Sequence, residues 1–154
     1  MGNVFLQYAF IFFVSMIPFV EVFVTVPIGT IVFNLPPVFV LIVAVIGNII
    51  SVSFFIFFGA EMNKFINKFR KTDKSRKEIN PKIKESFDRF GATGVSFFSS
   101  LLFSSQVGAG AMISFGASKS RVFVWTAMGV STLASIMAIL SVIAEELVIS
   151  LVNL

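Results

Sequence analysis

The feature that most constrains this chain is one glutamate, Glu21, inside an apolar run that is otherwise uncharged up to Glu61. A carboxylate in hydrocarbon is costly, so a lone acid in such a run indicates a functional site. Pro18 and Pro27 flank it, each removing a backbone donor, and Gly29 adds a permissive position. Because irregular backbone survives at membrane depth only against protein or a wet cavity, we expect a broken, re-entrant element here.

The composition places the chain among membrane proteins. Of its 154 residues, 56% are hydrophobic and 13% are charged, whereas about a quarter of a soluble domain is charged. The sequence has no Cys and no His, so we expect no disulfide, no metal site and no cofactor. No serine lies in a pattern that would give it a His or Lys as a catalytic base. The net charge of +4 is concentrated in one segment, so we expect no nucleic-acid partner. Because the sequence has no phosphate-binding loop, no metal-ligand cluster and no serine with a base, we expect no enzyme.

The apolar runs predict a single membrane domain over 1–154. Two runs, 38–58 and 122–143, are long enough to span a bilayer once. We divide the chain into a re-entrant hairpin over 1–35, a transmembrane helix over 36–60, a basic cytoplasmic segment over 61–90, a second re-entrant hairpin over 91–118, and a transmembrane helix and tail over 119–154.

The basic residues predict the topology. Every Lys and Arg lies in 64–89 or at Lys119 and Arg121, and the positive-inside rule puts both groups on the cytoplasmic side. The block 91–118 therefore enters and returns on one side, with its tip near Ser104–Gly108. The block 3–33 is either a hairpin from outside or a single kinked span. We favour the hairpin, with both termini outside, because no basic residue lies near the N-terminus.

This arrangement predicts an all-α integral membrane protein with two inverted repeats. Each repeat is a re-entrant helical hairpin followed by a transmembrane helix, and a basic amphipathic cytoplasmic segment joins them. The hairpin tips carry Glu21 and Gln106, and the following helices carry Gly47 and Gly129. Inverted repeats with broken helices are a recurrent plan of transporters. A homodimer is plausible, because one protomer with so few spans would shield both tips poorly from lipid.

The chain also resembles a known family. The stretch IPFVEVFVTVPIG at 17–29, followed by a helix with Gly47-Asn48, is similar to the first hairpin of the small multidrug export family, a branch of the DedA-like, VTT-domain membrane proteins. FGATG at 90–94 and VGAGA at 107–111 resemble its second re-entrant region. Family members usually carry prolines there and often a basic residue after the glutamate. This chain instead has Ser104, Ser105 and Gln106, and Val22–Phe23 follow Glu21.

The resemblance implies a protein of the prokaryotic cytoplasmic membrane with paired hairpins. The family's name implies drug export, whereas DedA-like relatives are associated with lipid movement, including polyprenyl phosphate carriers, and with the proton gradient. In those lipid-associated relatives, a glutamate in the first hairpin and arginines after the second hairpin are the residues implicated in lipid movement. Glu21 matches the first position, and Arg121 with Lys119 is nearest to the second.

Each candidate residue has a functional and a structural interpretation. Glu21 is either a proton-coupling carboxylate or an acid satisfied by backbone amides freed at the prolines. Lys119 and Arg121 either bind a phosphate headgroup or anchor the cytoplasmic side. Thr25, Ser105 and Gln106 are further candidates for substrate binding, although Ser105 and Gln106 could cap broken helix ends. We expect Pro18, Pro27, Gly29, Gly108 and Gly110 to break the hairpins, and Gly47, Asn48 and Gly129 to pack helices.

The sequence therefore predicts a secondary, proton-linked transporter or flippase. Its substrate would be a membrane lipid or amphipathic small molecule, with a lipid phosphate as the leading expectation. One alternative is the export of cationic drugs, for which Glu21 would be the counter-charge. Another is a membrane scaffold without transport activity. A third is a lipid scramblase, which would move lipid without proton coupling.

Overall fold

The computed structural model describes the backbone of residues 3–69, 81–102, 104–114 and 116–152, and within these leaves out the side chains of 59–69, 81–90 and a few further positions. The described chain is helical and contains no strand, as the sequence predicts. Its elements are α1 (Val4–Ser15), α2 (Glu21–Pro27), the π-helix η1 (Ile28–Val32), α3 (Pro37–Phe69), α4 (Pro81–Leu102), α5 (Ser105–Ser114) and α6 (Lys119–Val152).

Two of these helices are long and apolar enough to cross a membrane. They are Pro37–Phe58 of α3, with 22 residues and a mean hydropathy of 2.7, and Lys119–Leu147 of α6, with 29 residues and a mean hydropathy of 2.1. At 1.5 Å per residue they extend about 33 Å and about 44 Å, against a hydrocarbon core of about 30 Å. The apolar helices Val4–Ser15, Glu21–Val32 and Thr93–Leu102 are shorter.

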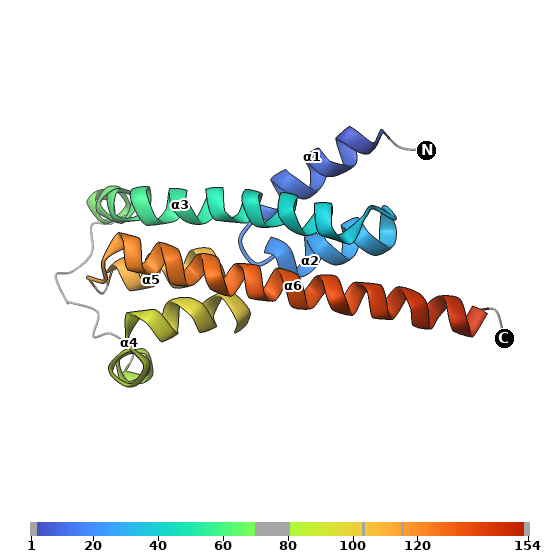
Figure 1. The fold of residues 1–154 in the computed structure, drawn as a ribbon. Coiled ribbons are helices and arrows are strands. Elements are labelled where there is room, and N and C mark those ends of the chain that lie inside the picture. Colours follow the sequence, from blue (N-terminus) through green and yellow to red (C-terminus); the bar gives the residue numbers. More distant parts are fainter. Residues whose placement is uncertain (1–2, 70–80, 103, 115, 153–154) are drawn as a thin grey trace.

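The short helices lie at opposite ends of the two long ones (Figure 1). The long helices α3 and α6 pack side by side, α1 and α2 lie toward the end that holds both termini, and α4 and α5 lie toward the other end. The turn between α1 and α2 and the last turn of α4 both lie near the middle of the molecule. Two broken segments thus approach the same level from opposite ends.

Four of the predicted hairpin-breaking residues lie inside helices, which corrects the prediction. Pro27 ends α2, and the chain continues as η1 through Gly29, with the Phe33 N–H bonded to the Ile28 carbonyl 3.0 Å away. Pro27 has no N–H to donate, and the helix widens to the π form after it without stopping. Gly108 and Gly110 lie within α5. Only Pro18 lies in a turn, between α1 and α2.

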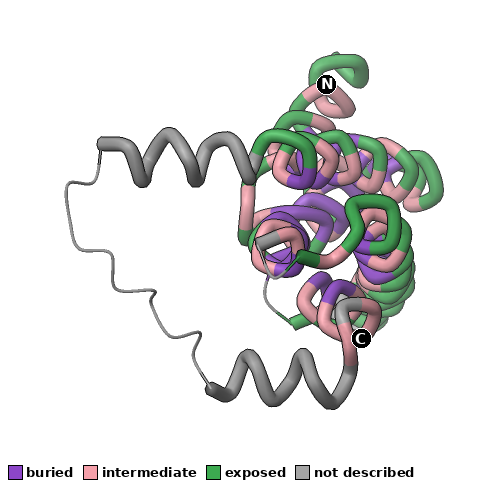
Figure 2. The backbone as a smooth tube through the Cα atoms, turned by 90° about the vertical axis from the view of Figure 1, so that its left-hand side faces the viewer, coloured by how far each residue is buried: buried purple, intermediate pink, exposed green. Residues whose placement is uncertain are grey.

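The helix interior consists of two apolar clusters separated by a polar layer. Buried residues gather between the helices, and exposed ones face outward (Figure 2). The first cluster contains Ile11, Val22, Val26, Leu35, Val40, Ala44, Val130, Ala134 and Ala138, and the second contains Val52, Ile56, Ala109, Met112 and Val122. Between them lie the buried polar residues Ser15, Glu21, Asn48, Ser51, Ser100, Ser104, Ser105, Gln106 and Thr126. Most of the described buried polar residues therefore lie in this layer, with Thr25, Thr30, Ser96 and Ser141 as the exceptions.

Gly47 and Gly129 lie where a long helix meets a short one. A Cβ at Gly47 would collide with the Phe12 carbonyl and the Ser15 hydroxyl of α1, and a Cβ at Gly129 would lie 2.6 Å from the Phe97 carbonyl oxygen of α4. These glycines let helix backbones approach directly, which is the usual role of small residues between membrane helices.

Gly129→Ala is therefore expected to lower stability by about 1–3 kcal/mol, the usual cost of overpacking. The added methyl group would meet the Phe97 carbonyl at 2.6 Å and Ser100 Cβ at 2.8 Å, so backbone would have to move. Thermal unfolding in detergent measures this as a lower Tm. Gly110→Ala is the matched control, because nothing lies within 4 Å of its Cβ position, and an equal loss there would contradict the packing argument.

The backbone of α4 bends at Gly91, where φ is 65° and ψ is 174°. Glycine adopts this conformation readily. The bend falls at the boundary that the sequence suggests between segment 61–90 and the second hairpin. The basic character of 61–90 rests on side chains outside the described residues.

Candidate functional site

Glu21 lies at the start of α2, directly after a strained turn. Phe19 and Glu21 have φ values of 69° and 42°, which side-chain-bearing residues rarely adopt. Such a residue costs on the order of 1–3 kcal/mol and persists only where the surroundings hold it. Ile17 precedes Pro18 and is therefore disfavoured in a helix, which helps to end α1 before the turn.

The Glu21 carboxylate is held by the first turn of a different segment. Its Oε1 accepts from the Ser104 hydroxyl at 2.7 Å and from the Ser105 N–H at 2.9 Å, and its Oε2 accepts from the Ser105 hydroxyl at 2.8 Å. The side chain is only 3% exposed. The N-terminus of α5 also favours negative charge, through its free N–H groups and the helix dipole. The donors thus come from the second broken segment, and not from amides freed at the prolines.

A second group of bonds ties α3 to the end of α1. The Asn48 Nδ2 donates to the Ser15 carbonyl at 3.2 Å, and the Ser51 hydroxyl donates to the Met16 carbonyl at 2.8 Å. These carbonyls need partners because α1 ends there. Asn48 Oδ1 lies 3.1 Å from the Ser105 Oγ, and Gln106 Nε2 lies 3.4 Å from the Ser51 Oγ. Helix α3 therefore joins both broken segments through polar contacts.

This polar layer lies at the middle of the apolar part of α3. Asn48 is eleven residues from Pro37 and ten from Phe58, about 17 Å and about 15 Å along the helix axis. Burying a carboxylate at this depth costs free energy, so its presence indicates a functional site.

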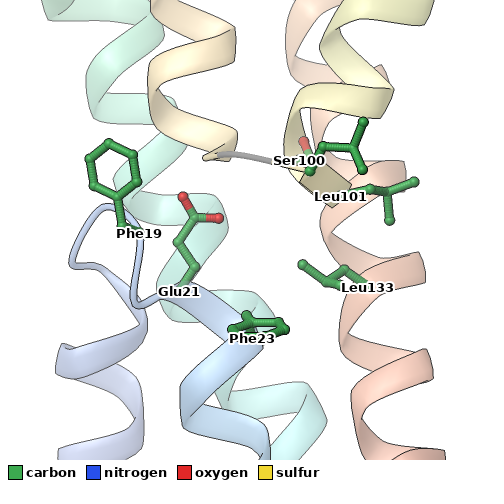
Figure 3. A pocket seen from close by; sticks show the side chains of 7 residues that line it. Phe19, Glu21, Phe23, Ser100, Leu101 and Leu133 are labelled. Carbon is green, nitrogen blue, oxygen red and sulfur yellow. The ribbon is translucent and has the colours of Figure 1, made fainter.

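A cavity of about 240 Å³ opens beside the carboxylate. Figure 3 shows Phe19, Glu21 and Phe23 on one side of it, with Ser100 and Leu101 of α4 and Leu133 of α6 opposite. The lining residues are Phe19, Glu21, Phe23, Ser100, Leu101, Leu102 and Leu133. The cavity therefore combines apolar walls with one carboxylate and one hydroxyl.

The structure brings only some of the predicted substrate residues together. Ser105 and Gln106 are fully buried in the polar layer with Glu21. Thr25 is also buried, but its hydroxyl donates to the Glu21 main-chain carbonyl at 2.7 Å, and it does not line the cavity. Within the described residues, no group of three or more His, Cys, Asp or Glu side chains could hold a metal ion.

Lys119 and Arg121 lie away from this site. Both are in the first turn of α6, where the Lys119 Nζ is 5.2 Å from the centroid of the Phe57 ring and Arg121 is exposed. Leu133, which lines the cavity, is twelve residues beyond Arg121, about 18 Å along the helix axis. The predicted basic pair therefore does not share the cavity with Glu21.

Sequence reasoning missed several residues of the site. Ser51 could have been found, because it follows Asn48 by three residues and so lies on the same face of α3. The lining residues Phe19, Phe23 and Leu133 resemble ordinary lipid-facing residues and give no signal of their own.

Comparison with known families decides the class of protein. The model of the family described as small multi-drug export proteins matches residues 21–136, which is more than half of the chain. The chain belongs to this family. The match begins at Glu21 and extends past Leu133, so it includes every residue of the cavity except Phe19. No curated protein and no solved structure matches the chain.

Membership confirms the predicted family, and the family's name describes an exporter rather than an enzyme. Together with the two apolar helices, it places the chain in a membrane. The wider DedA-like, VTT-domain assignment extends beyond what this match covers.

Proposed function

We propose that this chain is a proton-linked secondary transporter that exports amphipathic cations, with Glu21 as the group that binds the proton. The observation that carries the proposal is a carboxylate that is 3% exposed, is linked through Ser105 to the middle of the apolar span of α3, and borders a cavity. A carboxyl group in that position can hold either a proton or a cationic substrate. Exchange of one for the other would couple their movements.

The walls of the cavity support a cationic substrate over a lipid phosphate. Its charged group is a carboxylate, and the rings of Phe19 and Phe23 beside it could attract a cation through their faces. A phosphate would meet like charge at Glu21. The described basic side chains, Lys119 and Arg121, are about 18 Å or more along α6 from Leu133. This choice agrees with the family's name and replaces the lipid phosphate that we expected from the sequence.

We further propose that the two halves are inverted repeats with re-entrant hairpins. Gly47 meets Phe12 and Ser15 in the first half, and Gly129 meets Phe97 and Ser100 in the second. Phe12 and Ser15 belong to FFVSMIPFVE, and Phe97 and Ser100 belong to FFSSLLFSSQ. An ungapped alignment of these stretches pairs Glu21 with Gln106. The shared glycine contacts and the opposite placement of the short helices (Figure 1) support the repeat.

The proposed location is the prokaryotic cytoplasmic membrane, with both termini outside. Lys119 and Arg121 begin α6 at the end of the molecule opposite to both termini (Figure 1), and basic residues favour the cytoplasmic side. The native chain has no cysteine, so single cysteines report the topology cleanly. We expect a membrane-impermeant maleimide to label Asn3→Cys in intact cells and Ser120→Cys only after lysis. Labelling of Ser120→Cys in intact cells would reverse the orientation.

Proteoliposomes containing the purified protein test the function. We expect efflux of ethidium, an aromatic cation, to accelerate when the outside is made acidic, because protons entering would exchange for the cation. Protein-free liposomes are the control. A scaffold would give no efflux above that control, and a scramblase would move labelled lipid without a pH gradient. Either result would overturn the proposal.

A homodimer remains a prediction, for which the mass of the detergent-solubilised protein is the measurement.

A further inference from the structure

The Ser105 hydroxyl lies among more acceptors than it has hydrogens. Its Oγ is 2.8 Å from Glu21 Oε2, 3.1 Å from Asn48 Oδ1 and 3.1 Å from Gln106 Oε1. The Ser104 Oγ is similarly placed, 2.7 Å from Glu21 Oε1 and 3.2 Å from Gln106 Oε1. Each hydroxyl carries one hydrogen. The positions of the hydrogens therefore depend on the protonation state of Glu21.

An ionised Glu21 leaves Asn48 without a donor. The carboxylate then takes both serine hydrogens. Gln106 can adapt, because turning its amide round lets the NH₂ group donate to both serine oxygens and gives up only the long contact of 3.4 Å with the Ser51 Oγ. Asn48 cannot, because its Nδ2 already donates to the Ser15 carbonyl at 3.2 Å, and a reversed amide would set two carbonyl oxygens against each other. The buried Asn48 Oδ1 would face the Ser105 oxygen with no hydrogen between them, which is unfavourable.

A proton on Glu21 supplies the missing hydrogen. With the proton on Oε2, the carboxyl donates to the Ser105 Oγ, the Ser105 hydroxyl donates to Asn48 Oδ1, and the Asn48 Nδ2 donates to the Ser15 carbonyl. Every group in this chain then has a partner. The distances of 2.8, 3.1 and 3.2 Å along this chain fit such a pattern.

We propose that Ser105 and Asn48 are positioning residues that couple protonation of Glu21 to the contact between α5 and α3. This inference rests on the proposed proton role of Glu21. When the proton is bound, Ser105 ties the start of α5 to Asn48. When the proton leaves, the Ser105 hydroxyl turns to the carboxylate and this tie between the second broken segment and α3 is lost. Proton release would thereby loosen the contact between α5 and α3 while Ser105 stays bonded to Glu21.

No other described charge lies close enough to share this titration. On α6, Lys119, Arg121, Glu145 and Glu146 are each twelve or more residues from Leu133, about 18 Å or more along the axis. On α1, Tyr8 is seven residues before Ser15, about 10 Å. Among the described side chains of α2, η1, α3, α4 and α5, Glu21 alone is titratable.

Infrared difference spectroscopy tests the inference without requiring transport. The protonated carboxyl band that disappears in Glu21→Gln is titrated against pH in the purified protein. Asn48→Leu removes the acceptor that favours the protonated form, so we expect the midpoint of the band to move to lower pH by about one unit, a tenfold change in proton affinity. Ser53→Ala is the matched control. It removes only a bond within α3, from the Ser53 hydroxyl to the Ile49 carbonyl, so its midpoint should stay in place.

A second measurement uses the unaltered protein and covers the case in which Asn48→Leu does not fold. The nitrogen-15 resonance of the Asn48 side-chain amide is expected to titrate with the same midpoint as the carboxyl band. An Asn48 resonance that does not titrate, an unmoved midpoint in folded Asn48→Leu, or the lack of a Glu21 band at every pH would overturn the inference. If the midpoints move as expected but no ethidium is transported, the proposed function fails and the proton relay stands.

Discussion

Glu21→Gln is expected to abolish acceleration of ethidium efflux by a pH gradient while leaving folded protein in the membrane. The amide keeps the size of the side chain and can still accept from Ser104 or the Ser105 N–H, but it cannot bind and release a proton. It also removes the negative charge that would attract a cation. Losing one partner of a buried charge pair typically costs about 3–5 kcal/mol, or about 100-fold or more in binding.

The measurements for Glu21→Gln are the initial rate of efflux at several external pH values and ethidium affinity by fluorescence anisotropy. Glu146→Gln is the matched control, because it neutralises an exposed acid on α6 and should leave both quantities unchanged. Efflux in Glu21→Gln that still accelerates at acidic external pH would remove Glu21 from the coupling.

Leu133→Trp is expected to reduce transport at least tenfold by filling the cavity. Leu133 lines the wall opposite Glu21 (Figure 3), and the larger ring would occupy part of the roughly 240 Å³ in which we place the substrate. A loss of about 1.4 kcal/mol in binding corresponds to tenfold. Proton binding at Glu21 should persist, because the substitution does not touch Ser104 or Ser105.

Ile136→Trp is the matched control for this experiment. Ile136 lies on the same helix and is 44% exposed, so its larger ring should project outward and leave efflux unchanged. Leu133→Ala gives the opposite test, since it enlarges the cavity and should let bulkier cations through. Equal transport in Leu133→Trp and Ile136→Trp would place the substrate path elsewhere.

Comparing predicted and observed positions of individual residues shows which features a local sequence pattern can predict. The helical class, the two long apolar helices and the family followed from runs of hydropathy and from the motif around Glu21. The assignment of Gly108 and Gly110 to a hairpin break was wrong, because glycine permits irregular backbone without requiring it. In α5 both are helical, and Gly108 instead allows close approach to Ser99. The placement of Pro27 failed similarly, since Pro27 is the last residue of α2 and the chain continues after it as a π-helix.

The sequence by itself determined that a carboxylate would lie in an apolar run beside a turn at Pro18, because hydropathy and the missing proline N–H act over a few residues. Only the tertiary structure decided which groups satisfy that carboxylate. Ser104 and Ser105 are 83 and 84 residues away, and Lys119 and Arg121, which the sequence offered as partners in the site, lie elsewhere on α6. The physical reason is that packing between segments sets such contacts, and periodicity along one segment contains no information about its neighbour.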